Sequence, residues 1–242
     1  MRTLRLCCLA LALFAVAASS STAHAQQATD HRYGTWTGLF AHGPIKGDVW
    51  LWVDLQPRFY DSFEPQSVLV RPGISWRAMP ALFATLGYAW VPQWTQTPDP
   101  HEWGDINYID EHRIWEQLNY TPSDLARGLS GQFRLRGEQR FRTAGPSDVG
   151  VRLRMMARGQ VAIDRARNWF LISWDELFIA LNDAGTWQSS GFDQNRFFAG
   201  VGLQVVPAQL RLEFGYVNQW LFRAGTDPVN HIASLTAYLN WQ

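Results

Sequence analysis

The chain has 242 residues, of which 21 are basic and 21 acidic, so its formal net charge at neutral pH is zero. Without a basic excess we expect no nucleic acid partner. Aromatic residues make up 14% of the chain, including 13 Trp, 14 Phe and 7 Tyr. Such a composition is typical of aromatic girdles at membrane interfaces, and equally of a large aromatic core.

Residues 1–25 have the features of a secretory signal peptide. Arg2 and Arg5 form a basic start, residues 6–18 are almost wholly apolar, and Ala23-His24-Ala25 is a small-x-small cleavage site. The apolar stretch is shorter than the about 20 residues that a membrane-spanning helix needs. We therefore predict export and cleavage after Ala25. Both cysteines would leave with this segment, so no disulfide or thiolate metal site is expected.

Residues 26–34 form a polar lead, after which one pattern repeats along the chain. Runs with apolar side chains at alternate positions are separated by clusters of Gly, Pro, Asp or Asn, which is typical of strands and turns. No helical pattern of ordinary length interrupts them. The predicted strands lie near residues 35–43, 48–60, 67–79, 81–92, 111–121, 131–142, 149–163, 168–181, 195–206, 208–222 and 230–241.

The predicted connections sort by length. The two long ones, residues 93–110 and 182–194, both follow an even-numbered strand. Outer-membrane barrels have short periplasmic turns and longer extracellular loops. We therefore predict an all-β fold in which residues 35–242 form a single antiparallel, up-and-down transmembrane β-barrel. Because bacterial barrels have even strand numbers, we expect ten strands, alternatively twelve, with residues 35–43 not a full strand or one strand overlooked.

A soluble periplasmic β-sandwich that binds a ligand would also show alternation, and three features favour the membrane barrel over it. Several predicted strands reach the 9 to 11 residues needed for a tilted crossing of a bilayer. Lys46 is the single lysine, whereas a solvated strand face uses lysine freely. The final strand alternates through Leu235, Ala237, Leu239 and Trp241, and an alternating C-terminal strand with an aromatic end resembles the assembly signal of outer-membrane proteins.

Several segments resemble a known family. They are GTWTGLF, WVDLQPRF, RPGISWR, LGYAWVPQ, EHRIWEQLNY, LRGEQRF, VRLRMMARG and WDELFIALND, and the most specific pieces are Arg113 with Glu116-Gln117, Arg136 with Glu138-Gln139-Arg140, and Asp175-Glu176. Together they are similar to the domain-of-unknown-function family numbered 2490, from Gram-negative bacteria. The resemblance extends from about Tyr33 to Trp241. It implies an exported outer-membrane barrel and no particular activity.

Charged residues share one face on several predicted strands. A charge that faces lipid near the bilayer midplane costs about 2–4 kcal/mol, so we predict that these residues line the lumen. Two interpretations stay open: Arg–Glu pairs that fill a structural barrel, or a narrow, porin-like channel for small, anionic solutes. The predicted lumen network consists of Glu111, Arg113, Glu116, Gln117, Arg134, Arg136, Glu138, Arg140, Arg152, Arg154, Arg158, Glu176, Arg211 and Glu213.

Two further chemistries have weaker sequence support. Residues 99–112 contain carboxylates and two histidines that could hold a divalent cation, but their spacing matches no metal motif. No histidine lies in a nucleophile motif, and His112 with Ser173 or Ser130 is only a guess. We predict no catalytic residue, metal or cofactor, so the protein is not expected to be an enzyme; the alternative is an outer-membrane enzyme acting on lipids. Outer-membrane lipid and the assembly machinery are the expected partners.

Overall fold

The computed structural model describes residues 28–61, 63–95, 107–122, 125, 129–143, 148–223 and 225–241. In these residues all regular secondary structure is β-strand, and none of them forms a helix long and apolar enough to cross a membrane. The strands are β1 (Ala28–Lys46), β2 (Val49–Tyr60), β3 (Pro65–Met79), β4 (Leu82–Thr95), β5 (Asn107–Tyr120), β6 (Leu129–Arg142), β7 (Gly150–Ala162), β8 (Trp169–Ala180), β9 (Gly191–Val206), β10 (Leu210–Leu221) and β11 (Thr226–Asn240).

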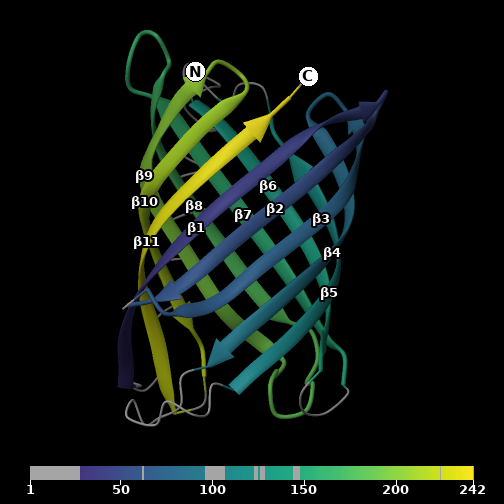
Figure 1. Cartoon of the computed structure of the whole chain (residues 1–242), viewed down its shortest axis with the longest axis vertical. Helices are drawn as coiled ribbons and strands as arrows, with labels where there is room; N and C mark the ends of the chain where they lie inside the picture. The colour runs from purple at the N-terminus through teal and green to yellow at the C-terminus, as the bar shows by residue number, and fades with distance from the viewer. Residues whose placement is uncertain are drawn as a thin grey trace, which may run out of the picture.

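The strands form one closed barrel in chain order, each antiparallel to the next, and β1 closes it by pairing with β11 (Figure 1). This closing pair is parallel and runs from Ala28↔Thr226 to His42↔Asn240. The predicted all-β barrel fold is confirmed, and the alternative fold, a β-sandwich, is wrong. The expectation of ten or twelve strands is also wrong. An odd number of alternating strands brings the first and last together pointing the same way, and a parallel ladder joins them.

The structure also corrects the start of the barrel domain. Strand β1 begins at Ala28, so residues 28–34 of the predicted polar lead belong to the barrel wall, and residues 35–43 are part of a full strand. The predicted signal peptide, residues 1–25, lies outside the described part of the chain.

The connections sort onto the two ends of the barrel as the sequence predicts. One end, the long-loop end, carries the β4–β5 and β8–β9 connections and the start of β1. The other, the short-turn end, carries tight turns such as that between β1 and β2, where Gly47 has a φ of +57°, together with the end of β11 (Figure 1). A positive φ costs little for a residue without a Cβ, which explains why glycine occupies this turn.

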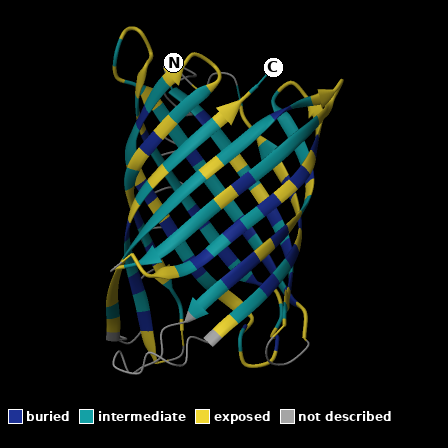
Figure 2. Cartoon of the chain, viewed as in Figure 1, coloured by how far each residue is buried: buried dark blue, intermediate teal, exposed yellow. Residues whose placement is uncertain are grey.

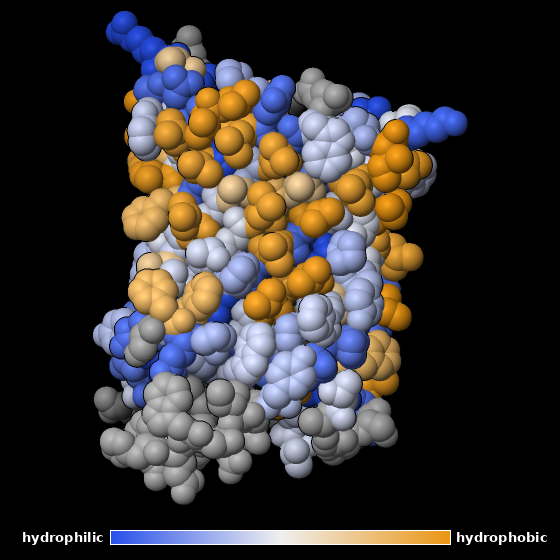
Figure 3. Space-filling view, viewed as in Figure 1, coloured by the Kyte–Doolittle hydropathy of each residue, from blue (hydrophilic) through white to orange (hydrophobic). Residues whose placement is uncertain are grey.

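The two faces of the wall have opposite polarity. Along several strands, such as β3 and β5, buried residues alternate with residues that are exposed on the outside (Figure 2). Large apolar side chains are exposed outward, with Leu86 and Phe214 each 60% accessible, whereas Arg136 and Glu138 inside are 1% and 0% accessible. Apolar side chains cover much of the surface seen in Figure 3. A soluble protein normally has the reverse distribution, and extended apolar surfaces mark an interaction with lipid or another protein.

Aromatic side chains fill part of the lumen. Trp115 of β5 is fully buried and packs with Leu69, Val91 and, from β2, Trp52. Its indole lies directly on the backbone of β3 and β4, where a Cβ at Gly87 would overlap the ring. Glycine is therefore required there for the ring to lie flat against the inner face of the wall.

Candidate functional site in the lumen

Unbroken alternation on β5, β6 and β7 places their charged residues together inside the barrel. In register, Arg113 lies opposite Arg140, and Arg136 lies opposite Arg154. Like charges directly opposite each other on neighbouring strands are unfavourable. Buried carboxylates compensate this repulsion by binding several arginines each.

Glu111 is the first of these carboxylates. It is fully buried, and its Oε1 accepts from Arg113 Nε at 2.6 Å and from Arg140 Nε at 2.8 Å. Its Oε2 accepts from Arg140 Nη2 and Arg142 Nε, both at 3.0 Å. Arg140 thus forms the bidentate pair that a planar guanidinium favours. One carboxylate therefore holds three arginines near the long-loop end.

Glu138 is the second and lies at the centre of the charged face. It accepts from Arg152 Nη2 and from Arg154 Nη1, each at 2.6 Å. Arg113 and Arg136 lie farther away, at 3.7 and 3.9 Å. Arg136 instead donates twice to Gln117 Oε1 and stacks over Trp115 at 4.4 Å. The aromatic filling and the charge network are therefore in direct contact.

The network continues across the lumen. Glu176 of β8 accepts from Arg134 at 2.7 Å and from Arg154 at 2.8 Å. Glu213 of β10 accepts from Arg158 and, at 2.9 Å, lies beside Arg211 Nε. A separate buried pair joins Arg71 of β3 to Asp54 of β2. Buried ion pairs add little net stability because desolvation offsets the attraction, but losing one partner leaves a costly uncompensated charge. Substitution of a single charged residue in this network is therefore expected to destabilise the barrel.

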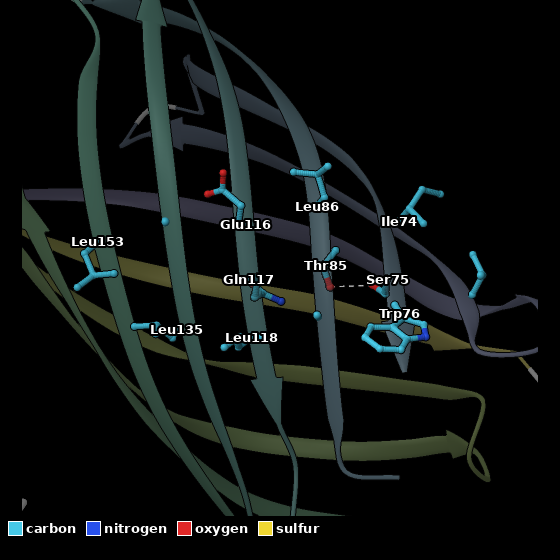
Figure 4. A pocket seen from close by; sticks show the side chains of 13 residues that line it. Ile74, Ser75, Trp76, Thr85, Leu86, Glu116, Gln117, Leu118, Leu135 and Leu153 are labelled. Carbon is cyan, nitrogen blue, oxygen red and sulfur yellow. Dashed lines mark hydrogen bonds between the residues drawn. The ribbon is translucent and has the colours of Figure 1, made fainter. Parts of the chain in front are cut away.

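Thirteen of the fourteen predicted lumen residues lie inside the barrel. The prediction is wrong for Glu116, which faces outward, because β5 has no bulge to move it onto the face of Glu111 and Gln117. On the outside its carboxylate accepts from the Gln139 amide at 3.2 Å. It borders an apolar groove of about 560 Å³ together with exposed Leu86 and Leu118 (Figure 4).

The adjacent carboxylates of β8 divide between the two faces. Glu176 points into the lumen, while Asp175 faces outward and is bound by the Asn195 amide at 3.0 Å. Strand alternation requires this division, since no bulge separates the two residues. Glu116 and Asp175 therefore share one arrangement, an outward carboxylate bound by an amide of the neighbouring strand.

Sequence reasoning missed part of the lumen lining. A parity signal existed for Asp54 and Arg58, which share a strand face with Trp50 and Trp52. Arg71 and Arg196 each share their strand with only one other charged residue, Arg77 and Asp193, so no charged ladder marked their face. Trp115 has the same parity as Arg113 and Gln117, which was the available sign that it points inward.

The weaker sequence hypotheses gain no support from the geometry. Residues 99–105 lie outside the described part of the chain. Of the remaining loop residues, Glu111 is held by three arginines, and no group of three metal-ligating side chains occurs among the described residues. His112 faces outward and contacts the Tyr88 hydroxyl, whereas Ser130 has lumen parity and Ser173 lies three strands away. The structure therefore brings His112 to neither serine.

These features define a class of protein: a closed β-barrel with an apolar outer face and a charge-filled lumen. A family model described as "Protein of unknown function (DUF2490)" matches residues 33–230, and the chain belongs to this family. The resemblance noted from the sequence is thus confirmed. An uncharacterized protein of Methylorubrum extorquens is 32% identical over 238 residues, which cover 96% of this chain and 97% of that protein. No solved structure matches the chain.

Proposed function

We propose that the protein is an outer-membrane β-barrel of a Gram-negative bacterium, exported by a cleaved signal peptide, with a closed lumen and a structural role in the envelope. The observation that carries this proposal is the reversed polarity of the wall, with large apolar side chains outside and ion pairs inside. In lipid, the outer side chains lose their contact with water, and closure of the sheet leaves no unpaired edge.

Aromatic side chains near the strand ends support the same placement. Exposed Tyr108 begins β5 near the long-loop end, and exposed Tyr120 ends it at the short-turn end. Trp169 at the start of β8 and Trp220 near the end of β10 are also exposed. Aromatic girdles at both interfaces of a bilayer have this arrangement.

The contents of the lumen favour a closed interior over an open pore. Glu111 and Glu138 are fully buried, and each binds arginines across the inner face. Trp115 occupies lumen space beside them. An open water-filled channel would instead expose its charged lining, as in large porins. The protein is accordingly proposed to be a non-enzymatic barrel, whose partners are lipid and the outer-membrane assembly machinery.

Membrane fractionation followed by detergent gels tests the barrel in its proposed location. We expect the protein in the outer-membrane fraction, migrating faster without boiling than after boiling, since a folded barrel resists unfolding in detergent. Recovery in the soluble periplasmic fraction would contradict the proposal. The relevant sample is the full chain expressed with its own leader.

A second candidate function, a narrow channel for small anions, is favoured by one observation. Arg58 and Arg196 line the lumen without an ion pair among the described residues, so the interior has uncompensated positive charge. Planar-bilayer recordings separate the two candidates. Stable anion-selective conductance supports the channel, whereas absence of conductance from protein shown to be folded supports the closed barrel.

A further inference from the structure

The lumen contains a cavity of about 120 Å³ whose lining does not include Glu111. One part of its wall is aromatic, formed by Trp36 and Phe40 of β1, Trp174 of β8 and Tyr238 of β11. Another part is cationic, with Arg58 of β2 and Arg196 of β9 among its members. The cavity therefore combines stacking surfaces with guanidinium groups.

The charges on this wall do not balance. Six arginines line the cavity, against the two carboxylates of Glu176 and Glu213. Four of the arginines belong to ion pairs: Arg71 with Asp54, Arg134 and Arg154 with Glu176, and Arg158 with Glu213. The two that have no ion pair within the described residues are Arg58 and Arg196.

Neutral groups hold these two guanidiniums in place. Arg58 donates to Gln56 at 3.1 Å, and its Nε is buried without a partner among the described residues. Arg196 reaches the side-chain amide of Gln219 at 3.1 Å. Both lie against the Trp36 ring, at 3.9 and 4.9 Å from its centre. Cation–π contacts offset part of the cost of desolvation. Glu176, which lies opposite Arg196 in the register of β8 and β9 and already binds Arg134 and Arg154, offsets part of the charge of Arg196. The charge of Arg58 has no such carboxylate among the described residues.

The chemistry of the cavity wall indicates which kind of ligand the cavity would bind. A carboxylate can accept two parallel N–H bonds from one guanidinium. No carboxylate among the described residues forms such a pair with Arg58. The aromatic wall offers stacking and edge contacts to a ring. A volume of about 120 Å³ holds only a few waters at about 30 Å³ each, so a long acyl chain is too large.

We propose that this cavity is a binding site for a small aromatic carboxylate, with Arg58 and Arg196 binding the anionic group and the aromatic part of the wall packing against the ring. The site depends on the barrel fold and not on the membrane placement. A protein that is found outside the outer membrane would still contain it, so the two proposals fail independently.

Isothermal titration of the folded, purified full chain with benzoate tests the proposal. Benzamide, an uncharged isostere, and acetate, an anion without a ring, are the comparison probes. We expect saturable binding of benzoate, with both comparison probes bound at least about tenfold more weakly, since each lacks one half of the recognition. Flat heats with benzoate overturn the proposal, as does equal binding of benzamide. Equal binding of acetate overturns the aromatic half of the assignment.

Two variants assign the binding to the named residues. We expect Arg58→Gln and Arg196→Gln each to weaken benzoate binding by roughly tenfold, because each removes a charged donor. Arg165→Gln, in the exposed turn between β7 and β8, is the matched control and should bind as the wild type does. Unchanged binding in both lumen variants contradicts the assignment. If neither variant folds, the comparison of benzoate with benzamide on the wild type still decides.

Discussion

The lumen has two regions with the same residue types and opposite states of charge compensation. Around Glu111 and Glu138, on β5 to β7, each neighbouring arginine forms an ion pair with one of the two carboxylates, the longest being Arg136 to Glu138 at 3.9 Å. Around Trp36, on β1, β2 and β9, Arg58 and Arg196 meet aromatic rings and amides instead. The first region therefore stabilises the wall, whereas the second has unused capacity to bind an anion.

The largest expected effect is at the centre of the compensated region. Glu138→Gln removes the charge that binds Arg152 and Arg154, so these two buried guanidiniums, two residues apart on β7, lose the carboxylate that they share. Breaking a buried ion pair in this way costs about 3–5 kcal/mol. Urea titration of the folded barrel in detergent should show a correspondingly lower unfolding midpoint.

Glu116→Gln is the control for that change, because Glu116 lies on the neighbouring strand but faces outward and is bound only by an amide. We expect this variant to lower the free energy of unfolding by well below 1 kcal/mol. Equal destabilisation by the two variants would show that the position of the carboxylate relative to the lumen does not matter.

Trp115→Ala tests the aromatic contribution to the same region. The indole is fully buried against β3 and β4 and supports Arg136, and removing a buried Trp costs about 3–5 kcal/mol at most sites. We expect a lower unfolding midpoint and, in planar bilayers, greater ion leakage through the space that the ring filled. Trp76→Ala, which truncates an outward side chain that is 58% exposed, should leave leakage unchanged.

The two regions should respond differently when one arginine in each is replaced with methionine. Arg154→Met deprives both Glu138 and Glu176 of a partner and should cost several kcal/mol. Arg58→Met removes an uncompensated charge and one cation–π contact, so we expect stability within about 1 kcal/mol of wild type, or a gain. Urea midpoints measured side by side check both, and similar losses would mean that Arg58 is compensated after all.

The sequence predicted the fold better than it predicted the site. All eleven strands were visible because alternation is a local property, and the face of Arg134 to Arg140 followed from the same alternation. Strand number failed because an even count was assumed, while the parallel ladder between β1 and β11 joins segments at opposite ends of the chain. Which carboxylate forms an ion pair with each arginine was also not predictable. It depends on which strands face each other across the barrel, such as β7 and β10 for Arg158 and Glu213.

The smallest expected effect lies outside the lumen, in the turn between β7 and β8. The Asp164 carboxylate accepts from the backbone N–H of Trp169 at 2.8 Å and of Asn168 at 3.2 Å, and these bonds lower the pKa of Asp164.

Because the folded state has the lower pKa, the stabilisation is complete above the unfolded value of about 3.9 and is lost as pH falls through the folded value. Unfolding midpoints measured from pH 6 downward should therefore decrease slightly less in Asp164→Asn than in wild type. An identical pH dependence in the two proteins would indicate that these backbone bonds do not contribute to stability. A clear difference would separate acid sensitivity at the turn from that of the lumen carboxylates, which the variant leaves intact.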